Sequence, residues 1–419
     1  MHAAFSTDSR NAHIYAIVEA VQEMSKSSRQ YVSVALDGID AEWFDEINPQ
    51  TRREKVPPSD CLGVLRVMTT SRKHHEMIGD DIREGQWVIV EIGKSENSPR
   101  VWAFASTNDY ESVRRFSLLS IGLLPSAPTG QSAGGALGPI ATAGARLRRN
   151  FDLRNLKRPN VSQAKRLLKQ LHRPTKCIAH DVGQANCCEL LNCFGPKVPR
   201  VSAFVDIGEP LPFHRRTYNQ NLQRMISKAG LVVLTHWDWD HISAGRHNRR
   251  QGRLFNQAKW IVPLQIIGPN AFYNVAVPNR RNLVLLSNQN HIIRSGCVDL
   301  HFGNGVGEDR NNTGIGVVVS LVSKARVLLP GDARLGRGGL EIRAAMKHVV
   351  VPHHGGSGCG VPNRQPRNRT NAVMSVGYPN YYNHPNLATS GAYHAAGWAI
   401  FHTDTRCPQR GHRGLVTFV

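Results

Sequence analysis

Apolar residues near the start of the chain recur at the spacing of a helix. They lie one, three or four positions apart, at Ile14, Ile17, Val18, Val21 and Met24. That interval places side chains on one face of a helix, so the pattern predicts a helix over residues 11–27.

Four runs rich in β-branched and aromatic residues come next and predict strands. They are YVSVALDG (31–38), CLGVLRVMTT (61–70), QWVIVEIGK (86–94) and VWAFAS (101–106). A helix followed by strands predicts a small α+β domain over residues 1–124. It contains no chemical motif that reveals its role.

The composition changes after this domain. Residues 125–145 are rich in Gly, Ala, Ser and Pro and predict a flexible linker. Residues 146–174 are dense in Arg and Lys, and the spacing of Leu167, Leu168 and Leu171 predicts an amphipathic helix in part of them. A solvated connector is the plainer alternative, because charge runs usually lie in solvent. We interpret 125–175 as a linker and a basic arm.

From residue 176 to residue 419 the pattern predicts one further domain of strands separated by loops. Its apolar runs lie at 201–205, 231–234, 316–322, 326–329 and 348–351. Several of these runs are followed at once by His, Asp or Gly. Ionisable residues that follow strands lie at the edge of a sheet, where binding sites form.

The run LVVL leads into the segment THWDWDHISAG, which holds four ligand-type residues within six positions. They are His236, Asp238, Asp240 and His241. Imidazole and carboxylate groups bind divalent first-row metals, and four of them suit two close ions. A capping loop, with Asp240 or Ser243 as the helix N-cap, is the structural alternative.

Three further strand ends carry ligand-type residues. Asp332 follows VLLPG, His353 and His354 follow VVVP, and Asp206 ends FVD. Each alone has an ordinary explanation as a turn or capping residue. Four strand ends that deliver His and Asp in one domain indicate a metal site.

These residues resemble the signature of the metallo-β-lactamase fold superfamily. His236-x-Asp238-x-Asp240-His241 is similar to HxHxDH, with Asp in place of the second His. The resemblance implies an α/β fold, an αββα sandwich over residues 176–419. It also implies that Asp206 is a supporting acid, that Asp332 bridges the metals, and that His353 or His354 is the last ligand.

Within that superfamily the chain most resembles the hydrolase domain of ComEC-type competence proteins. The similar segments, in order, are HDVGQANCCEL (180–190), GDA, PHHGGS, SVGYPNYYNHP (375–385) and FHTDT (401–405). The chain departs from that group where DVGQGDA has become DVGQANCC. It also lacks a clear histidine of the third motif, and Asn312, His301 or a water molecule is expected in that place.

The resemblance implies two divalent ions, Zn²⁺ or Mn²⁺, that lower the pKa of a shared water toward neutrality. His236 and Asp238 would hold one ion. Asp240, His241 and His354 would hold the other, with His353 as a phosphate contact.

Three residues, Asp240, Asp332 and His384, are expected to take part in catalysis. His384 would bind substrate phosphate or donate a proton, although a loop histidine that caps a helix is an equal alternative. Tyr381, Tyr382 and Asn383 could line the same cleft. The two tryptophans that alternate with the ligands, Trp237 and Trp239, are expected to pack in the core.

The net charge of the chain favours one class of substrate. The net charge is +21, from 52 Lys and Arg against 31 Asp and Glu. Such a surplus favours a polyanionic partner, nucleic acid first, although a lineage rich in arginine would show it too. We expect a phosphodiesterase, most concretely a DNA or RNA nuclease. The alternatives are a hydrolase of cyclic nucleotides or other small phosphodiesters, and a catalytically quiet nucleic-acid-binding module.

Eight cysteines without a CxxC pair do not resemble a secreted disulfide framework. The chain begins without the pattern of a signal peptide, and no apolar run reaches the length of a membrane span. We therefore expect a cytoplasmic protein without a membrane partner. A nuclease joined to a domain of sensor size suggests an effector of bacterial defence against phage, with a protein partner at residues 1–124.

Overall fold

The computed structural model divides the chain into two compact units. Unit 1 comprises Met1–Leu156 and Ile266–Val277, and unit 2 comprises Lys157–Gln265 and Pro278–Val419. The structure describes residues 11–26, 29–47, 55–79, 81–106, 110, 113–124, 137–194, 201–218, 228–246, 252–288, 292–307, 309–365, 369–380, 382–406 and 412–419. The boundary between the units falls inside the stretch predicted as linker and arm.

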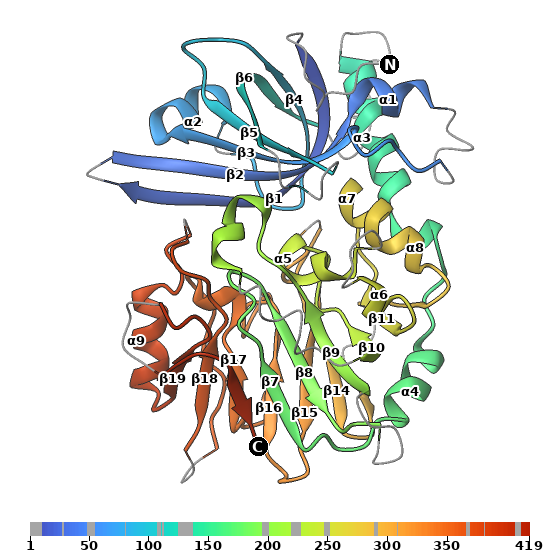
Figure 1. The fold of residues 1–419 in the computed structure, drawn as a ribbon, viewed down its shortest axis with the longest axis vertical. Coiled ribbons are helices and arrows are strands. Elements are labelled where there is room, and N and C mark those ends of the chain that lie inside the picture. The colour runs from blue at the N-terminus through green and yellow to red at the C-terminus, as the bar shows by residue number, and fades with distance from the viewer. Residues whose placement is uncertain are drawn as a thin grey trace. The chain divides into compact units, whose positions relative to one another are not determined.

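In its described part, unit 1 is built on a closed barrel with the strand order β1-β2-β3-β5-β6-β4 (Figure 1). The strands are β1 (Ala12–Lys26), β2 (Arg29–Asp40), β3 (Leu62–Thr70), β4 (Trp87–Gly93), β5 (Arg100–Ala105) and β6 (Val113–Leu123). Buried aliphatic residues from all six strands fill the barrel, among them Ile14, Leu36, Val67, Val90 and Val101. A β-barrel therefore replaces the expected α+β arrangement.

The helix predicted over residues 11–27 is wrong, because this segment is strand β1. Two features give its apolar residues helical spacing: Ile14 and Ile17 are buried on opposite faces of the strand, and a bulge follows Val18. Val18 pairs with Leu36 and Ala20 pairs with Ala35, so the residue between them has no partner in the register. The extra residue places Val18 and Val21 on the same face of the strand, three positions apart.

The expected flexible linker at 125–145 is wrong over its second part, because α3 (Leu137–Phe151) begins there. Leu147 and Phe151 of α3 are fully buried, and Phe151 stacks on Trp87 at 5.3 Å between ring centroids. Residues 125–136 lie outside the described residues. The other helical segments of unit 1 are α1 (Ala41–Glu46), α2 (Ser71–Met77), a 3₁₀ turn (Leu153–Asn155), α7 (Pro269–Ala271) and a π-helical turn (Phe272–Ala276).

Unit 2 contains two sheets in its described part. In Figure 1 the strands of the first sheet are green to yellow, except for the dark red C-terminal strand, and those of the second sheet are orange to red. The first has the order β12 (Leu283–Leu286), β11 (Lys259–Pro263), β10 (Lys228–Val233), β9 (Val201–Ile207), β8 (Cys187–Leu191), β7 (Lys176–Ala179) and β21 (Val416–Phe418). The second has the order β13 (Ile292–Ser295), β14 (Val298–Phe302), β15 (Ile315–Ser320), β16 (Arg326–Leu329), β17 (His348–Val350), β18 (Asn371–Met374), β19 (Ala399–His402) and β20 (His412–Arg413).

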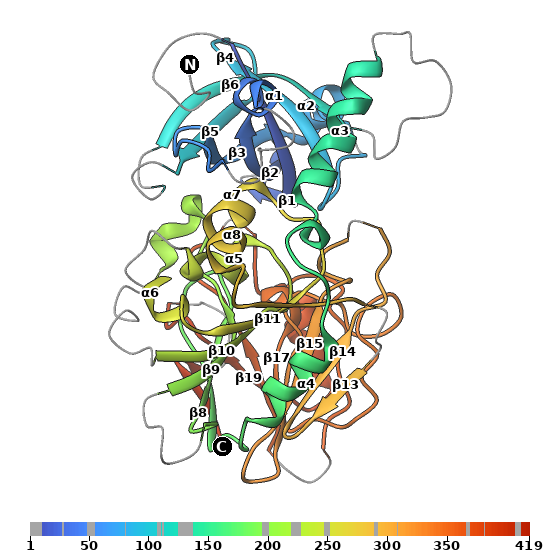
Figure 2. The same ribbon diagram turned by 90° about the vertical axis from the view of Figure 1, so that its right-hand side faces the viewer.

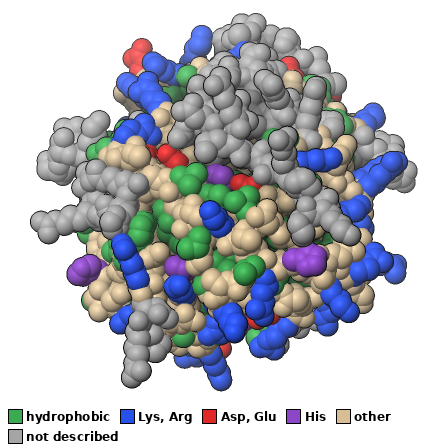
Figure 3. Space-filling view, turned by 60° about the horizontal axis from the view of Figure 1, so that its bottom comes forward, with side chains coloured by type: hydrophobic (Ala, Val, Ile, Leu, Met, Phe, Trp, Pro, Cys, Tyr) green, Lys and Arg blue, Asp and Glu red, His purple; other side chains and the backbone are tan. Residues whose placement is uncertain are grey.

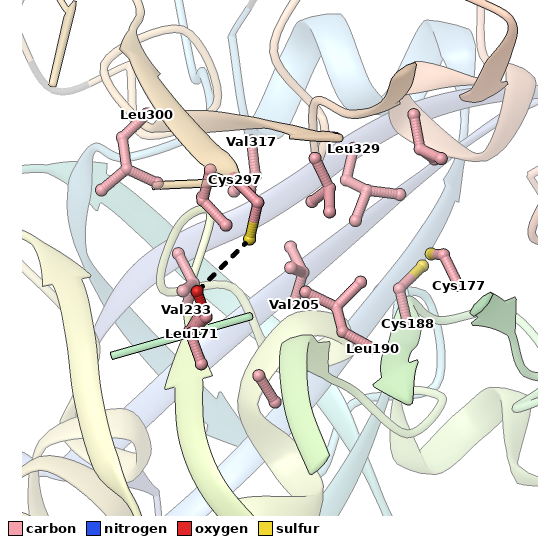
Figure 4. Packing of buried hydrophobic residues seen from close by; sticks show 14 of the residues in the cluster. Leu171, Cys177, Cys188, Leu190, Val205, Val233, Cys297, Leu300, Val317 and Leu329 are labelled. Carbon is pink, nitrogen blue, oxygen red and sulfur yellow. Dashed lines mark hydrogen bonds between the residues drawn. The ribbon is translucent and has the colours of Figure 1, made fainter. Parts of the chain in front are cut away.

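The two sheets pack face to face over one apolar core. Val205 and Val233 of the first sheet belong to the same buried cluster as Val317 and Leu329 of the second (Figure 4). Alternate residues on β10 face this core, as strand geometry requires. The predicted strands at 201–205, 231–234, 316–322, 326–329 and 348–351 are confirmed.

Helices cover the sandwich. α5 (Trp239–Ile242) and α6 (Gly252–Phe255) lie against the first sheet, and α9 (Leu387–Ala395) lies against the second. α4 (Val161–Lys169) packs on β12 and β13, the edge strands of the two sheets (Figure 2). Its buried Leu168 confirms the predicted amphipathic helix. The remaining helical turns are Pro212–Thr217, Ser243–Gly245, α8 (Val277–Asn279) and Pro352–Gly355.

The part of the chain that the structure describes has no helix with the length and apolar character needed to cross a bilayer.

Candidate metal centre

Parallel strands bring the ligand-type residues together. β9 and β10 are parallel neighbours in the first sheet, and β16 and β17 are parallel neighbours in the second. The carboxyl ends of parallel neighbours lie at the same edge of a sheet. Asp206, His236, Asp332 and His354 all lie at or just after these ends.

Asp206 fixes the orientation of His241. Its carboxylate accepts hydrogen bonds from the Thr235 main-chain N–H at 2.8 Å, from the Thr235 hydroxyl at 2.9 Å, and from Nδ1 of His241 at 2.8 Å. The Asp206 backbone has φ 56°, in the left-handed region that aspartate tolerates better than most residues. Nδ1 of His241 carries the donated proton, so Nε2 presents a lone pair whenever the ring is neutral, as it is when Nε2 binds a metal ion.

The Thr235 hydroxyl holds His236 in the tautomer that carries its proton on Nδ1. It donates to Asp206, so it accepts from Nδ1 of His236 at 3.1 Å. The Nε2 atom of His236 is buried without a hydrogen-bond partner. A Cβ atom on Gly331 would lie 2.3 Å from the Thr235 hydroxyl, and Gly331 has φ +61°, so this position requires glycine.

His354, like His241 and His236, has its Nδ1 fixed by a hydrogen bond. Its Nδ1 donates to the main-chain oxygen of Ser375 at 2.7 Å, and its Nε2 lies 3.2 Å from Oδ2 of Asp240. When His354 is neutral, a lone pair on Nε2 therefore faces a carboxylate. Two electron-rich atoms at this distance need a proton or a metal ion between them.

Asp332 faces His241 as Asp240 faces His354: its Oδ1 lies 3.1 Å from Nε2 of His241. Neither atom has a partner in hydrogen-bonding geometry. Burial opposes ionisation of Asp332, but the positive charge of His241, His353 and His354 lowers its pKa well below the usual value. Burial would lower the pKa of His241, yet Asp332 and Asp206 raise it well above the usual value.

The residues present therefore fit a divalent cation. Two groups have ligand atoms that all lie within 4.8 Å of one another: His236, His241 and Asp332, and Asp240, His241 and His354. The ligand atoms are imidazole nitrogens and carboxylate oxygens, which suit Zn²⁺ and Mn²⁺. The polar atoms buried without partners in these groups are those that an ion would bind.

Asp238, expected as a ligand, lies outside both groups. Its Oδ1 is 2.9 Å from Nη2 of Arg310, and its Oδ2 is 3.4 Å from Nε2 of His236. Burial would raise the pKa of Asp238, but the charges of Arg310 and His236 lower it. Asp238 therefore bridges an arginine and a histidine.

Asn312 does not take the place of the missing third-motif histidine. Its Nδ2 donates to Asp309 at 2.8 Å, and its Oδ1 accepts the main-chain N–H of Arg334 at 2.9 Å. Both ends of the amide therefore hold the loop between β14 and β15 in place. His301 lies on β14 and belongs to neither ligand group.

His353 and His384 form a second layer beside the ligands. Their rings lie 5.2 Å apart, and the ring of His384 lies 6.3 Å from that of His354. Burial and the neighbouring His353 and His354 lower the pKa of His384 well below its usual value. His384 is therefore neutral near pH 7.

Gln184 selects the tautomer of His384. Its Oε1 accepts the main-chain N–H of Gly377 at 3.3 Å, which fixes the orientation of the amide. Its Nε2 then donates to Nδ1 of His384 at 3.2 Å. Because Nδ1 accepts, the proton of the neutral ring is on Nε2.

Both tryptophans of the motif are buried, as expected for core residues. Trp237 donates Nε1–H to the main-chain oxygen of Pro263 at 3.0 Å, and the Arg246 guanidinium lies 4.9 Å from the centroid of Trp239. Neither ring is available to stack on a base. Tyr381 lies outside the described residues, while the ring of Tyr382 lies 5.7 Å from that of His384.

Three residues that contact the candidate site were not predicted from the sequence. Thr235 and Gln184 lie in two segments discussed above, THWDWDHISAG and HDVGQANCCEL. They were overlooked because neither side chain is a usual metal ligand. Arg310 precedes the NNTG segment and is one of many arginines in a basic chain. For Thr235 the sequence offered one signal, a hydroxyl side chain directly before the metal motif.

Comparisons with known proteins leave the family open. No protein-family model matches the chain, and no curated protein matches it. A diphosphatase from the PhnP family is similar at 12% identity, over 56% of this chain and 84% of that chain, with a TM-score of 0.32.

Two other solved structures are similar at a TM-score of 0.22. A flavodiiron protein from Giardia intestinalis is 12% identical over 40% of each chain. The metallo-β-lactamase MIM-1 from Novosphingobium pentaromativorans is 11% identical over 40% of this chain and 64% of that chain. Scores this low carry no argument, so the chemistry has to be inferred from the side chains.

Proposed function

We propose that this chain is a metal-dependent phosphodiesterase that cuts DNA or RNA. One observation carries the proposal: His236, His241 and His354 turn Nε2 toward Asp240 and Asp332 within a buried cluster. A divalent ion held there would lower the pKa of a water molecule and stabilise charge on a phosphoryl oxygen. The sequence resemblance to the metallo-β-lactamase superfamily supports the same chemistry.

The protein residues would hold and orient the reacting groups. Asp206 keeps the His241 ring in the tautomer that presents Nε2. His384, neutral and protonated on Nε2, offers a hydrogen-bond donor to a phosphate oxygen. The lowered pKa favours this binding role for His384 over the role of proton donor. His353, beside it, would contact the same phosphate.

Charge supports a polymeric substrate. On the exposed side of α4 lie Lys165, Arg166 and Lys169, and basic side chains are far more common than acidic ones on the face in Figure 3. Neutralised phosphates release counterions, so such a surface favours a long polyanion. A small phosphodiester would not need this surface.

Cleavage assays test the proposal. The purified full chain should cut single-stranded DNA, duplex DNA or RNA with Mn²⁺ or Zn²⁺, and should stop when EDTA is added. Asp332→Asn should reduce cleavage by at least about 100-fold. Asp299→Asn, a half-exposed acid on β14, is the matched control. Equal product from wild type and Asp332→Asn would remove the enzymatic proposal and leave a binding module.

Salt separates the polymer from the small substrate. Cleavage of nucleic acid should fall steeply as salt rises, whereas cleavage of bis(p-nitrophenyl) phosphate or a cyclic nucleotide should change little. If only the small esters are cut, and without salt dependence, the substrate is a small phosphodiester.

A role in defence against phage is a further part of the proposal, and it rests on the sequence alone. Cells that carry the intact gene should plate fewer phage than cells with the Asp332→Asn variant. Equal plating across a broad phage panel would contradict this role.

A further inference from the structure

The two candidate ligand groups share one residue, His241. Its Nε2 lies 3.1 Å from Oδ1 of Asp332 in one group and 3.8 Å from Oδ1 of Asp240 in the other. Nδ1 of His241 is committed to Asp206. An imidazole nitrogen has one lone pair and binds one ion. His241 therefore serves one ion, which both groups surround.

A second ion beside the first would need ligands from His236, Asp238 and Asp332. Asp238 is the residue that would have to complete this set, and it lies outside both groups. Its Oδ1 atom already has a cation at 2.9 Å, the guanidinium of Arg310. A second metal ion would have to share Asp238 with this positive charge.

Arg310 is firmly placed. Its side chain is 4% exposed, and a guanidinium cannot lose its charge in a protein. Burying it is tolerable because an acid lies beside it. The Gln265 side chain donates to the Arg310 main-chain oxygen at 2.7 Å, and the main-chain oxygen of Asp309 accepts from the Thr313 N–H at 3.0 Å within the same loop.

The chain also lacks the histidine expected from this loop, and Asn312 is fully engaged in holding it. The loop between β14 and β15 thus supplies a cation where the resemblance predicts a metal ligand. A positive side chain in place of a ligand opposes metal binding and replaces the charge that the metal would bring.

We infer that Arg310 takes the place of one of the two metal ions expected from the sequence. The centre then holds one divalent ion through His241 and a fixed guanidinium charge at Asp238. This inference rests on the proposed metal-dependent function and specifies its cofactor. A guanidinium supplies a fixed positive charge but cannot activate water, so the single ion would serve the chemistry while the Arg310 charge compensates Asp238.

Metal content of the full chain tests this. Wild type, loaded with Mn²⁺ and dialysed, should retain about one ion per chain by elemental analysis, with the Mn²⁺ spin-resonance spectrum of an isolated ion. Arg310→Ala uncovers Asp238 and should raise the content to about two ions, with the spectrum of a coupled pair. Arg310→Lys keeps the charge and should stay near one ion.

A second variant keeps the test decisive if Arg310→Ala does not fold. Asp238→Asn should leave the wild-type count unchanged at about one ion, because Asp238 binds Arg310 and not the metal. Two ions in wild type, reduced to one by Asp238→Asn, would overturn the inference and leave the proposed function intact. One ion in both wild type and folded Arg310→Ala would also overturn it. A chain that binds no divalent ion would defeat the proposed function as well.

Discussion

Gln184 donates its side-chain Nε2–H to Nδ1 of His384 over 3.2 Å, and its Oε1 is held by the main-chain N–H of Gly377. The neutral His384 ring therefore carries its proton on Nε2. A residue from the turn after β7 thus sets the hydrogen-bonding role of a histidine that lies 200 positions away.

Gln184→Glu should change the pH profile of cleavage. A carboxylate in this place accepts a hydrogen bond from Nδ1–H and raises the pKa of His384. Above that raised pKa the ring keeps its proton on Nδ1 and turns a lone pair toward the phosphate. Activity of Gln184→Glu should therefore fall as the pH rises, whereas wild type has no such limb.

Gln184→Leu provides the comparison without a charge. It should lower kcat by about 10-fold or more at every pH, because the tautomer is no longer selected. Gln170→Leu, on an exposed residue after α4, is the control. Identical pH profiles for wild type and Gln184→Glu would show that Gln184 has only a structural role.

Asp206→Asn should weaken metal binding by about 10- to 100-fold, the usual effect of removing a hydrogen-bond partner of a metal-bound histidine. The amide that replaces the carboxylate no longer requires a proton on Nδ1 of His241, so Nε2 loses its fixed lone pair. Titration calorimetry with Mn²⁺ or Zn²⁺ measures the change, with Asp299→Asn as the matched control. Equal affinities for wild type and Asp206→Asn would contradict the role given to Asp206.

Much of the site could be predicted because its chemistry follows strands whose apolar runs are visible in the sequence. His236, Asp240, His241, Asp332 and His354 all come after such runs, and the structure brings them together. Asp238 was expected beside them from its place in the His-x-Asp-x-Asp-His segment. Its partner Arg310 comes from a loop whose path no local pattern reveals.

The barrel of unit 1 could not be predicted because the residue pattern of β1 does not alternate. In β1 the buried residues lie on both faces, as Tyr15 and Ile17 are buried along with Ile14. Alternation therefore gives no signal, and the bulge at Val18 produces helical spacing instead. Pairing with strands distant in sequence overrides the local pattern.

His348 should make stability depend on pH. Burial, with Lys347 nearby, lowers its pKa to about 4 from the usual 6.5. The unfolded chain binds a proton at this site between pH 6.5 and pH 4 while the folded chain does not, so stability is lost as the pH falls through that window. Each kcal/mol lost lowers the Tm by roughly 2–4 °C in a domain of this size.

The measurement is the slope of Tm between pH 6.5 and pH 4. His348→Leu should flatten the slope relative to wild type, whatever its effect at pH 7, and His394→Leu, on an exposed residue of α9, should not. Parallel slopes for wild type and His348→Leu would show that His348 does not contribute.

The exposed basic residues of α4 should set the salt dependence of nucleic-acid binding. Changing Lys165, Arg166 and Lys169 together to Gln should weaken binding and reduce the slope of log K against log salt by up to about 3 if each contacts one phosphate. Cleavage of bis(p-nitrophenyl) phosphate should not change. Arg72→Gln with Lys73→Gln on α2 is the control pair, and an unchanged slope in the α4 variant would place the nucleic acid elsewhere.

The central claim is that buried imidazoles and carboxylates centred on His241 bind a divalent ion. Elemental analysis of the purified, dialysed full chain tests it most directly, beside His241→Ala measured in the same way. We predict that wild type retains a divalent ion and that His241→Ala loses it while remaining folded. Wild type without bound metal, or a folded His241→Ala that retains as much metal as wild type, would contradict the account.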